Sequence, residues 1–284
     1  MARALADGIA THYEVVGDGA PLLMFSPGGF DATADKWRTQ GIYARIKPLD
    51  HLSQRFSCIT FDRRECGESD GRIEPVTWAK YAAQGKGLLD HLRITRAHVM
   101  GACMGCGPAL ALAVACPELV ASLVLYWPVG GPKYRINGQR RFGDHVAFVE
   151  QQGLSGVVAL ARESDTAFGQ DPRRGPWAPV IRRDHAFADA FAAQNPAGYL
   201  AIVRTMADGL FDRDTAPGAE PEALMTVHSP ALIVPGHDAT HATSAARYLE
   251  ECLPRSQYWD IPVADQTESC VSPRLVSFLE DVTP

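Results

Sequence analysis

Short apolar runs alternate with longer amphipathic stretches through the first 127 residues of the chain and again near its end. Runs of four to nine mostly apolar residues predict buried strands, and apolar positions repeating every three or four residues predict helices. The expected strands are Gly8–Val16, Pro21–Phe25, Ser57–Phe61, Ala97–Met100, Ser122–Tyr126, Ala231–Val234 and Tyr258–Ile261. The expected helices cover about Asp35–Gln54, Thr77–Leu92, Met104–Cys116, Thr243–Leu253 and Pro273–Asp281. This alternation implies an α/β fold, with a mostly parallel sheet and helices on both faces.

The alternation stops between Pro128 and about Glu222, where the pattern is helical and rich in alanine and arginine. We therefore expect a sheet domain built from residues 1–128 and 223–284, interrupted by a helical segment at 129–222. Such a segment is expected over the carboxyl ends of the strands, where open α/β sheets bind ligands. Its best helices are Val146–Arg162, Arg182–Gln194 and Gly198–Leu210.

Composition narrows the class of protein. The 284 residues carry a net charge of -6 and no block of Lys and Arg, which argues against nucleic acid as a partner. No apolar run reaches the roughly 18 residues of a membrane span, and Met1–Gly8 lacks the apolar core of a signal peptide. Seven scattered cysteines fit a reducing compartment better than a disulfide framework. We expect a cytoplasmic protein with a small-molecule substrate and no membrane partner; a homodimer stays open.

The most informative stretch is Gly101–Gly105, which reads Gly-Ala-Cys-Met-Gly between an expected strand and an expected helix. This is the pattern of a nucleophile elbow, with Cys103 in place of the usual serine. Small flanking residues suit a nucleophile held in a strained turn. A helix N-terminus also favours the thiolate form of a cysteine.

Four segments in this order resemble the α/β-hydrolase superfamily. They are Ser26–Gly29 after the second strand, Asp62–Ser69 after the third, the elbow, and Pro235–Asp238 after the late strand. Together they span most of the chain. The resemblance implies the α/β-hydrolase fold, identifies the helical segment with a cap domain, and implies no cofactor.

The resemblance also assigns roles to residues. It implies that Cys103 is the nucleophile and that Asp238 is the acid of a triad. The backbone amides of Met104 and of Gly29 or Phe30 would form the oxyanion hole. Segment 62–69 would be a structural turn that braces the elbow.

The chain departs from the superfamily at the catalytic base. A histidine is expected after the last strand, but Asp265 or Gln266 falls there, and no histidine follows His241. Two interpretations of His241 stay open. A rearranged loop could bring it to Cys103, oriented by Asp265, or it could be a surface or capping residue like its neighbour His237. A cysteine tolerates a missing base better than a serine does, because part of a free thiol is already ionised at neutral pH.

Other signals have competing interpretations. Cys103 and Cys106 form a C-x-x-C that could be a redox pair, although the elbow already explains the flanking glycines. Phe30 and Trp127 either line an apolar pocket or seal the helical segment onto the sheet. No spacing of cysteines and histidines predicts a metal site. The pairs Arg63–Arg64 and Arg140–Arg141 could bind an anionic substrate, but we expect them to be exposed and paired with nearby carboxylates such as Glu65. His145 and His185 could reach a cleft from the helical segment, but we expect them to be solvated, and His98 to be a satisfied core residue.

The leading hypothesis is a hydrolase or acyltransferase that uses Cys103 on a small ester, thioester or lactone, with a degenerate triad. The alternative is a lyase or an inactive small-ligand-binding protein on the same fold.

Overall fold

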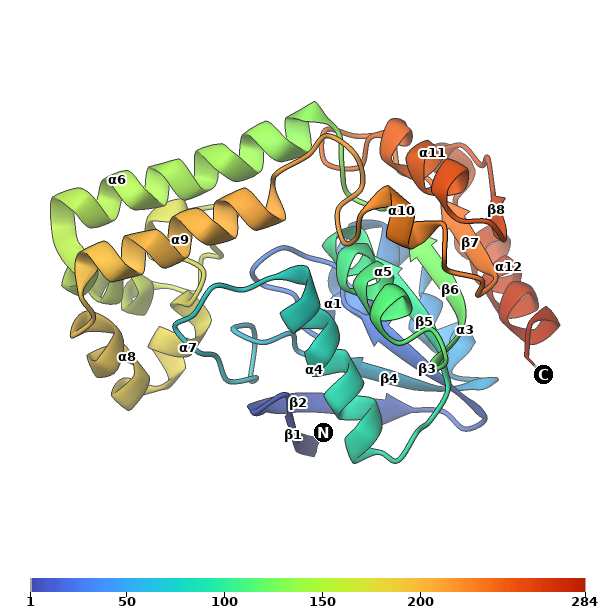
Figure 1. The fold of residues 1–284 in the computed structure, drawn as a ribbon. Coiled ribbons are helices and arrows are strands. Elements are labelled where there is room, and N and C mark those ends of the chain that lie inside the picture. Colours follow the sequence, from blue (N-terminus) through green and yellow to red (C-terminus); the bar gives the residue numbers. More distant parts are fainter. Residues whose placement is uncertain (1, 284) are drawn as a thin grey trace.

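The computed structural model describes residues 2–283, which form one eight-stranded sheet between two layers of helices (Figure 1). The strands follow one another across the sheet in the order β1-β2-β4-β3-β5-β6-β7-β8. The pairs β1–β2 and β2–β4 are antiparallel and all later pairs are parallel. The strands are β1 (Ala2–Ala6), β2 (Ile9–Val16), β3 (Ala20–Phe25), β4 (Phe56–Phe61), β5 (Ala97–Ala102), β6 (Val120–Tyr126), β7 (Ala231–Val234) and β8 (Ser256–Tyr258).

Helices cover both faces of this sheet, as the alternating pattern predicts. One face packs against α4 and α5, and the other against α1–α3 and α12. Strands β5 and β6 at the centre are buried along their whole length, which matches their unbroken apolar sequence. The helices of these layers are α1 (Lys36–Thr39), α2 (Gly41–Ile46), α3 (Pro48–Leu52), α4 (Trp78–His91), α5 (Cys106–Ala115), α10 (Pro221–Leu224), α11 (Thr243–Cys252) and α12 (Glu268–Asp281).

The helical segment between β6 and β7 extends away from the sheet (Figure 1). Its longest element, α6, is interrupted at Gly153, where φ is 66°. Aromatic side chains hold the segment together; Tyr199, for example, packs against Phe191 with ring centroids 5.0 Å apart. Its helices are α6 (Pro132–Glu163), α7 (Ala178–Arg183), α8 (His185–Ala192) and α9 (Pro196–Leu210).

Some local predictions of helices and strands differ from the structure. The single helix expected over 35–54 is three short helices, because Gly41 and Lys47 adopt positive φ values and Pro48 starts a new helix. The strand expected at 8–16 is confirmed as β2, but it pairs with β1, a strand from Ala2 that was not among the expected ones. In the helical segment, α6 begins at Pro132, 14 residues before the expected start at Val146, and the helix expected over 182–194 is divided into α7 and α8. The sheet-domain elements around the candidate site agree with the expected ones within a few residues.

Candidate active site

Cys103 lies at a sharp turn between β5 and α5. Its φ is 53°, a left-handed conformation that is strained for any residue with a side chain. The turn brings backbone segments so close that a Cβ on Gly101 would lie 2.5 Å from the carbonyl oxygen of Gly105. A Cβ on Gly105 would collide with the carbonyl oxygen of Phe25 at the end of β3. The glycines around Cys103 are therefore required by the backbone of the turn.

A second turn, after β7, carries Asp238 and His241. The carboxylate of Asp238 accepts hydrogen bonds from the backbone N–H groups of Thr240 (2.7 Å) and His241 (2.9 Å). The same carboxylate lies 2.9 Å and 3.0 Å from Nδ1 of His241 through its two oxygens. One aspartate thus shapes the turn and orients the imidazole that the turn presents.

This turn is fixed to the rest of the sheet end. His241 forms an isolated β-bridge with Gly130, which lies in the segment after β6. The indole of Trp127 packs 5.3 Å from the imidazole, measured between ring centroids. A Cβ on Gly236 would approach the Cβ of His241 to 2.6 Å, so the histidine occupies space that only a glycine leaves open. These contacts direct the imidazole inward.

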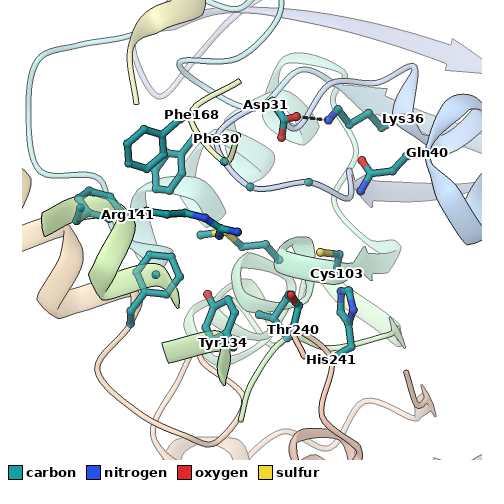
Figure 2. A pocket seen from close by; sticks show the side chains of 18 residues that line it. Phe30, Asp31, Lys36, Gln40, Cys103, Tyr134, Arg141, Phe168, Thr240 and His241 are labelled. Carbon is teal, nitrogen blue, oxygen red and sulfur yellow. Dashed lines mark hydrogen bonds and ion pairs between the residues drawn. The ribbon is translucent and has the colours of Figure 1, made fainter. Parts of the chain in front are cut away.

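The imidazole of His241 faces the sulfur of Cys103 (Figure 2). The His241 side chain is 13% exposed, and its Nε2 has no well-aligned hydrogen-bond partner among the described residues. The thiol is the polar group beside that nitrogen, and the two groups alter each other's pKa. The structure thereby brings Cys103, His241 and Asp238 into one row, with acid and histidine three residues apart on a single turn.

The electrostatics of this row favour an ion pair. Burial opposes ionisation of Cys103, but the charge of the adjacent His241 and the nearby backbone amides outweigh it, so the pKa of Cys103 is lowered. Burial also opposes the charged form of His241, yet the charge of Cys103 and the hydrogen bond to Asp238 raise the pKa of His241. The hydrogen bond from His241 holds the pKa of Asp238 far below its usual value. These opposite shifts of the two pKa values favour the thiolate–imidazolium form of the pair.

Two backbone amides approach the sulfur, those of Gly28 and Met104, and both lower the pKa of Cys103. The sequence had suggested Gly29 or Phe30 as the donor beside Met104. Gly28 has a φ of 108°, a backbone conformation open to glycine, and this bend turns its N–H toward the elbow. Gly28, Gly29 and Phe30 all line the adjoining cavity, so Gly29 or Phe30 as oxyanion donor beside Met104 stays a prediction.

The cavity beside Cys103 has a volume of about 270 Å³ and lies between the sheet and the helical segment. Its apolar wall joins Phe30 from the core with Phe142 and Phe168 from the helical segment; Phe30 lies 5.1 Å from Phe168 between ring centroids. Further residues that line the cavity are Asp31, Lys36, Gln40, Val129, Tyr134, Arg141, Phe211 and Thr240. The loops after β3, β5 and β7 meet here, at the carboxyl ends of parallel strands.

Trp127 does not line this cavity, so the suggestion that it contacts a ligand there is wrong. Its indole N–H donates to Oε1 of Gln266 over 2.7 Å, and its ring stacks on Tyr126 with an angle of 17°. Trp127 belongs to the support behind His241.

Gln266 occupies the position where the superfamily resemblance predicts a histidine. It is fully buried, accepts from the Tyr126 hydroxyl over 2.6 Å and donates to the Pro235 carbonyl over 2.9 Å. Asp265 beside it is exposed and, within residues 2–283, forms no hydrogen bond with His241, whose Nδ1 is held by Asp238; Asp265 therefore does not orient the imidazole. The side-chain amide of Gln266 links Tyr126 at the end of β6 to Pro235 after β7. The imidazole beside Cys103 comes instead from His241, on the turn that carries Asp238.

Several polar residues expected to be solvated are buried. Arg63 is 3% exposed and packs 4.2 Å from the ring centroid of Tyr81, and Arg64 is 1% exposed and pairs with Glu65 over 3.0 Å. These partners offset the cost of burying the two cations. Both arginines thereby stabilise the turn after β4.

The remaining histidines divide between surface and core. His145 is fully buried in the helical segment, contrary to expectation, with Nε2 2.6 Å from the Tyr199 hydroxyl. His185 is exposed as expected. His98 is a satisfied core residue, as expected, with Nδ1 2.8 Å from the Ser122 hydroxyl.

Residues 2–283 contain no group of three or more His, Cys, Asp or Glu side chains placed to hold a metal ion. All seven cysteines, Cys106 included, are free thiols. None of the helices in the described part of the chain combines the length and apolar character needed to cross a membrane.

Comparison with known proteins finds similarity to the alpha/beta hydrolase fold and to several enzymes. Residues 21–134 match the family model described as alpha/beta hydrolase fold. The 2-hydroxymuconate semialdehyde hydrolase of Pseudomonas sp. strain CF600 is 29% identical over 230 residues, which cover 79% of this chain and 74% of that protein. The acetyltransferase component of the acetoin cleaving system of Cupriavidus necator is 34% identical over 124 residues, and the match spans only 31% of that protein.

Among solved structures, a meta-cleavage product hydrolase from Pseudomonas fluorescens IP01 matches with a TM-score of 0.62. It is 19% identical and the match covers 100% of this chain and 98% of that one. The eight-stranded, mostly parallel sheet flanked by helices has the α/β-hydrolase fold, to which the family model over residues 21–134 also corresponds.

Proposed function

We propose that this protein is a cysteine hydrolase or acyltransferase that acts on a small ester, thioester or lactone through Cys103, His241 and Asp238. The observation that carries the proposal is the position of His241, which is held by Asp238 on one ring nitrogen and turned toward Cys103 with the other. Hydrolases among the relatives support an enzyme of this general class. Helices α6–α9 act as the cap over the site.

Acylation starts from the thiolate–imidazolium pair. The Cys103 sulfur attacks the carbonyl carbon, and the electron pair of the C=O bond moves to the oxygen, which the amides of Gly28 and Met104 stabilise. As the tetrahedral intermediate collapses, the bond to the leaving group breaks and His241 donates its proton to the departing oxygen or sulfur. The products of this half-reaction are a Cys103 thioester, a free alcohol or thiol, and a neutral His241.

Deacylation uses the same groups in reverse. Neutral His241 takes a proton from water, or from an alcohol or thiol acceptor, as that oxygen or sulfur attacks the thioester carbonyl. Collapse expels the Cys103 thiolate and leaves the proton on His241, which restores the starting pair. Asp238 stabilises the imidazolium and fixes the ring orientation throughout.

The test combines turnover with thiol labelling. Wild type should hydrolyse 4-nitrophenyl pentanoate, and iodoacetamide should modify Cys103 at a pH below that needed for an ordinary thiol, as read by peptide mass spectrometry. Cys103→Ala should abolish both signals. Cys106→Ala is the matched control, because Cys106 is a buried thiol whose sulfur donates to the Gly101 carbonyl.

Equal turnover by wild type and Cys103→Ala would refute the proposal. Loss of turnover in Cys106→Ala alone would favour the redox pair instead. A wild type that binds the ester without turnover would favour the ligand-binding alternative.

A further inference from the structure

One charged side chain in the cavity has no protein partner. Arg141 extends from α6 into the middle of the cavity, between Phe30 and Phe168 on one side and Tyr134 on the other (Figure 2). Among residues 2–283, no hydrogen bond, ion pair or cation–π contact of Arg141 is formed, although 22 ion pairs occur elsewhere. Its position is half-buried. The guanidinium is thus held at an apolar wall without a counter-charge.

The other charged groups of the lining are paired with one another. Lys36 forms an ion pair with Asp31, which is the acidic residue of the lining. The Cys103 thiol lies beside His241, and Asp238 lies behind His241 and outside the lining. Among the described residues, no carboxylate therefore pairs with Arg141.

An arginine in this setting favours a carboxylate. Its planar N–H groups match the two oxygens of a carboxylate, and removal from water strengthens each charge-assisted hydrogen bond. An unpaired cation at an apolar wall is costly, and a bound anion removes that cost. The neighbouring aromatic side chains suit the carbon skeleton of the same ligand.

Arg141 and Cys103 line one cavity of about 270 Å³, so a single small molecule can meet both. We propose that Arg141 is a specificity-determining residue that binds a carboxylate of the substrate while Cys103 attacks an ester, thioester or lactone carbonyl in the same molecule. This inference rests on the proposed function and narrows its substrate class to anionic acyl compounds.

The experiment compares two esters of equal chain length, mono-4-nitrophenyl glutarate and 4-nitrophenyl pentanoate, which differ by a terminal carboxylate. Wild type should prefer the glutarate ester. Arg141→Met should lower kcat/KM for the glutarate ester about 10- to 100-fold, mainly through KM, the range expected for one charge-assisted pair. The same variant should leave kcat/KM for the pentanoate ester within about twofold, because that ester makes no such pair.

Arg140→Met is the matched control, since Arg140 carries the same charge one residue earlier but is exposed and outside the cavity lining. It should change neither ester. Equal losses on both esters with Arg141→Met would overturn the inference, because they indicate a structural role. Cys103-dependent turnover of the pentanoate ester with no preference for the glutarate ester would also overturn it, and would leave the proposed function intact. Turnover of neither ester would count against the proposed function itself.

Discussion

His241 at the carboxyl end of the sheet and His145 in the helical segment are both largely shielded from solvent, and their pKa values are shifted in opposite directions. His241 has two anionic neighbours, the Asp238 carboxylate and the Cys103 sulfur, and its pKa is raised although burial opposes this. His145 faces the neutral Tyr199 hydroxyl and the carbonyl of Arg173, and burial lowers its pKa to about 4. Burial alone therefore does not decide the charge of a histidine; the charge of its partners does.

Removing the imidazole at the sheet end should have the largest effect. His241→Gln should lower kcat/KM for 4-nitrophenyl pentanoate by about three orders of magnitude, because both proton transfers lose their carrier. It should also move iodoacetamide labelling of Cys103 to higher pH, since burial then controls the thiol. His237→Gln, on the same turn but exposed, is the control and should match wild type. Unchanged labelling in His241→Gln would show that the pair is not formed.

Removing only the negative charge of Asp238 should have the next largest effect on kcat/KM. Asp238→Asn keeps the size of the side chain but lowers the proton affinity of His241, and we expect about a hundredfold loss in kcat/KM. The thiolate should again require higher pH in labelling experiments. Asp265→Asn is the control, because that exposed acid lies on the turn that does not contact His241. Equal effects of the two variants would contradict the assignment of the acid.

In the helical segment, the lowered pKa of His145 makes the free energy of unfolding depend on pH. The folded state keeps His145 neutral down to about pH 4, whereas the unfolded chain takes up the proton near pH 6.5. Stability from this group is therefore present above pH 6.5 and is lost as pH falls from 6.5 to 4. Wild type should lose about 3 kcal/mol of unfolding free energy across this window relative to His145→Gln. Denaturant titrations at several pH values measure it, with exposed His185→Gln as control; a constant difference would contradict the prediction.

The smallest effect concerns the neutral partner of His145. Tyr199→Phe removes the 2.6 Å contact with Nε2 and should lower the free energy of unfolding by about 1 kcal/mol at pH 7. Tyr258→Phe is a fair control, because the Tyr258 hydroxyl is buried without a partner in the described protein. A larger loss in Tyr258→Phe would mean that the His145 contact contributes little.

The sequence predicted the sheet, the elbow and the helical segment because each depends on local pattern. Strand β7, for example, matches the expected Ala231–Val234 at both ends. The strained turn at Cys103 could also be predicted from the sequence, because close backbone contacts require glycines on both sides of it. These features depend on residues that are neighbours in the chain.

The base was harder to assign than the acid, because the direction of its imidazole depends on tertiary contacts. His241 follows Asp238 by three residues, and the Asp238 carboxylate closes this turn by accepting hydrogen bonds from two of its amides. The β-bridge to Gly130, which directs His241 inward, joins residues 111 positions apart and leaves no local trace. The burial of Arg63 and His145 likewise follows from partners distant in sequence, Tyr81 and Tyr199.

Acid and histidine share one short turn, so their relative position is set by a few backbone torsions and not by the packing of two separate elements. On the proposed assignment, strand β8 and helix α12 contribute no reacting group. Strand β8 pairs with β7, and α12 packs on the sheet through its apolar side chains. Their remaining link to the site is Gln266, which accepts from Trp127 behind His241, so substitutions elsewhere in these elements are expected to spare the reaction.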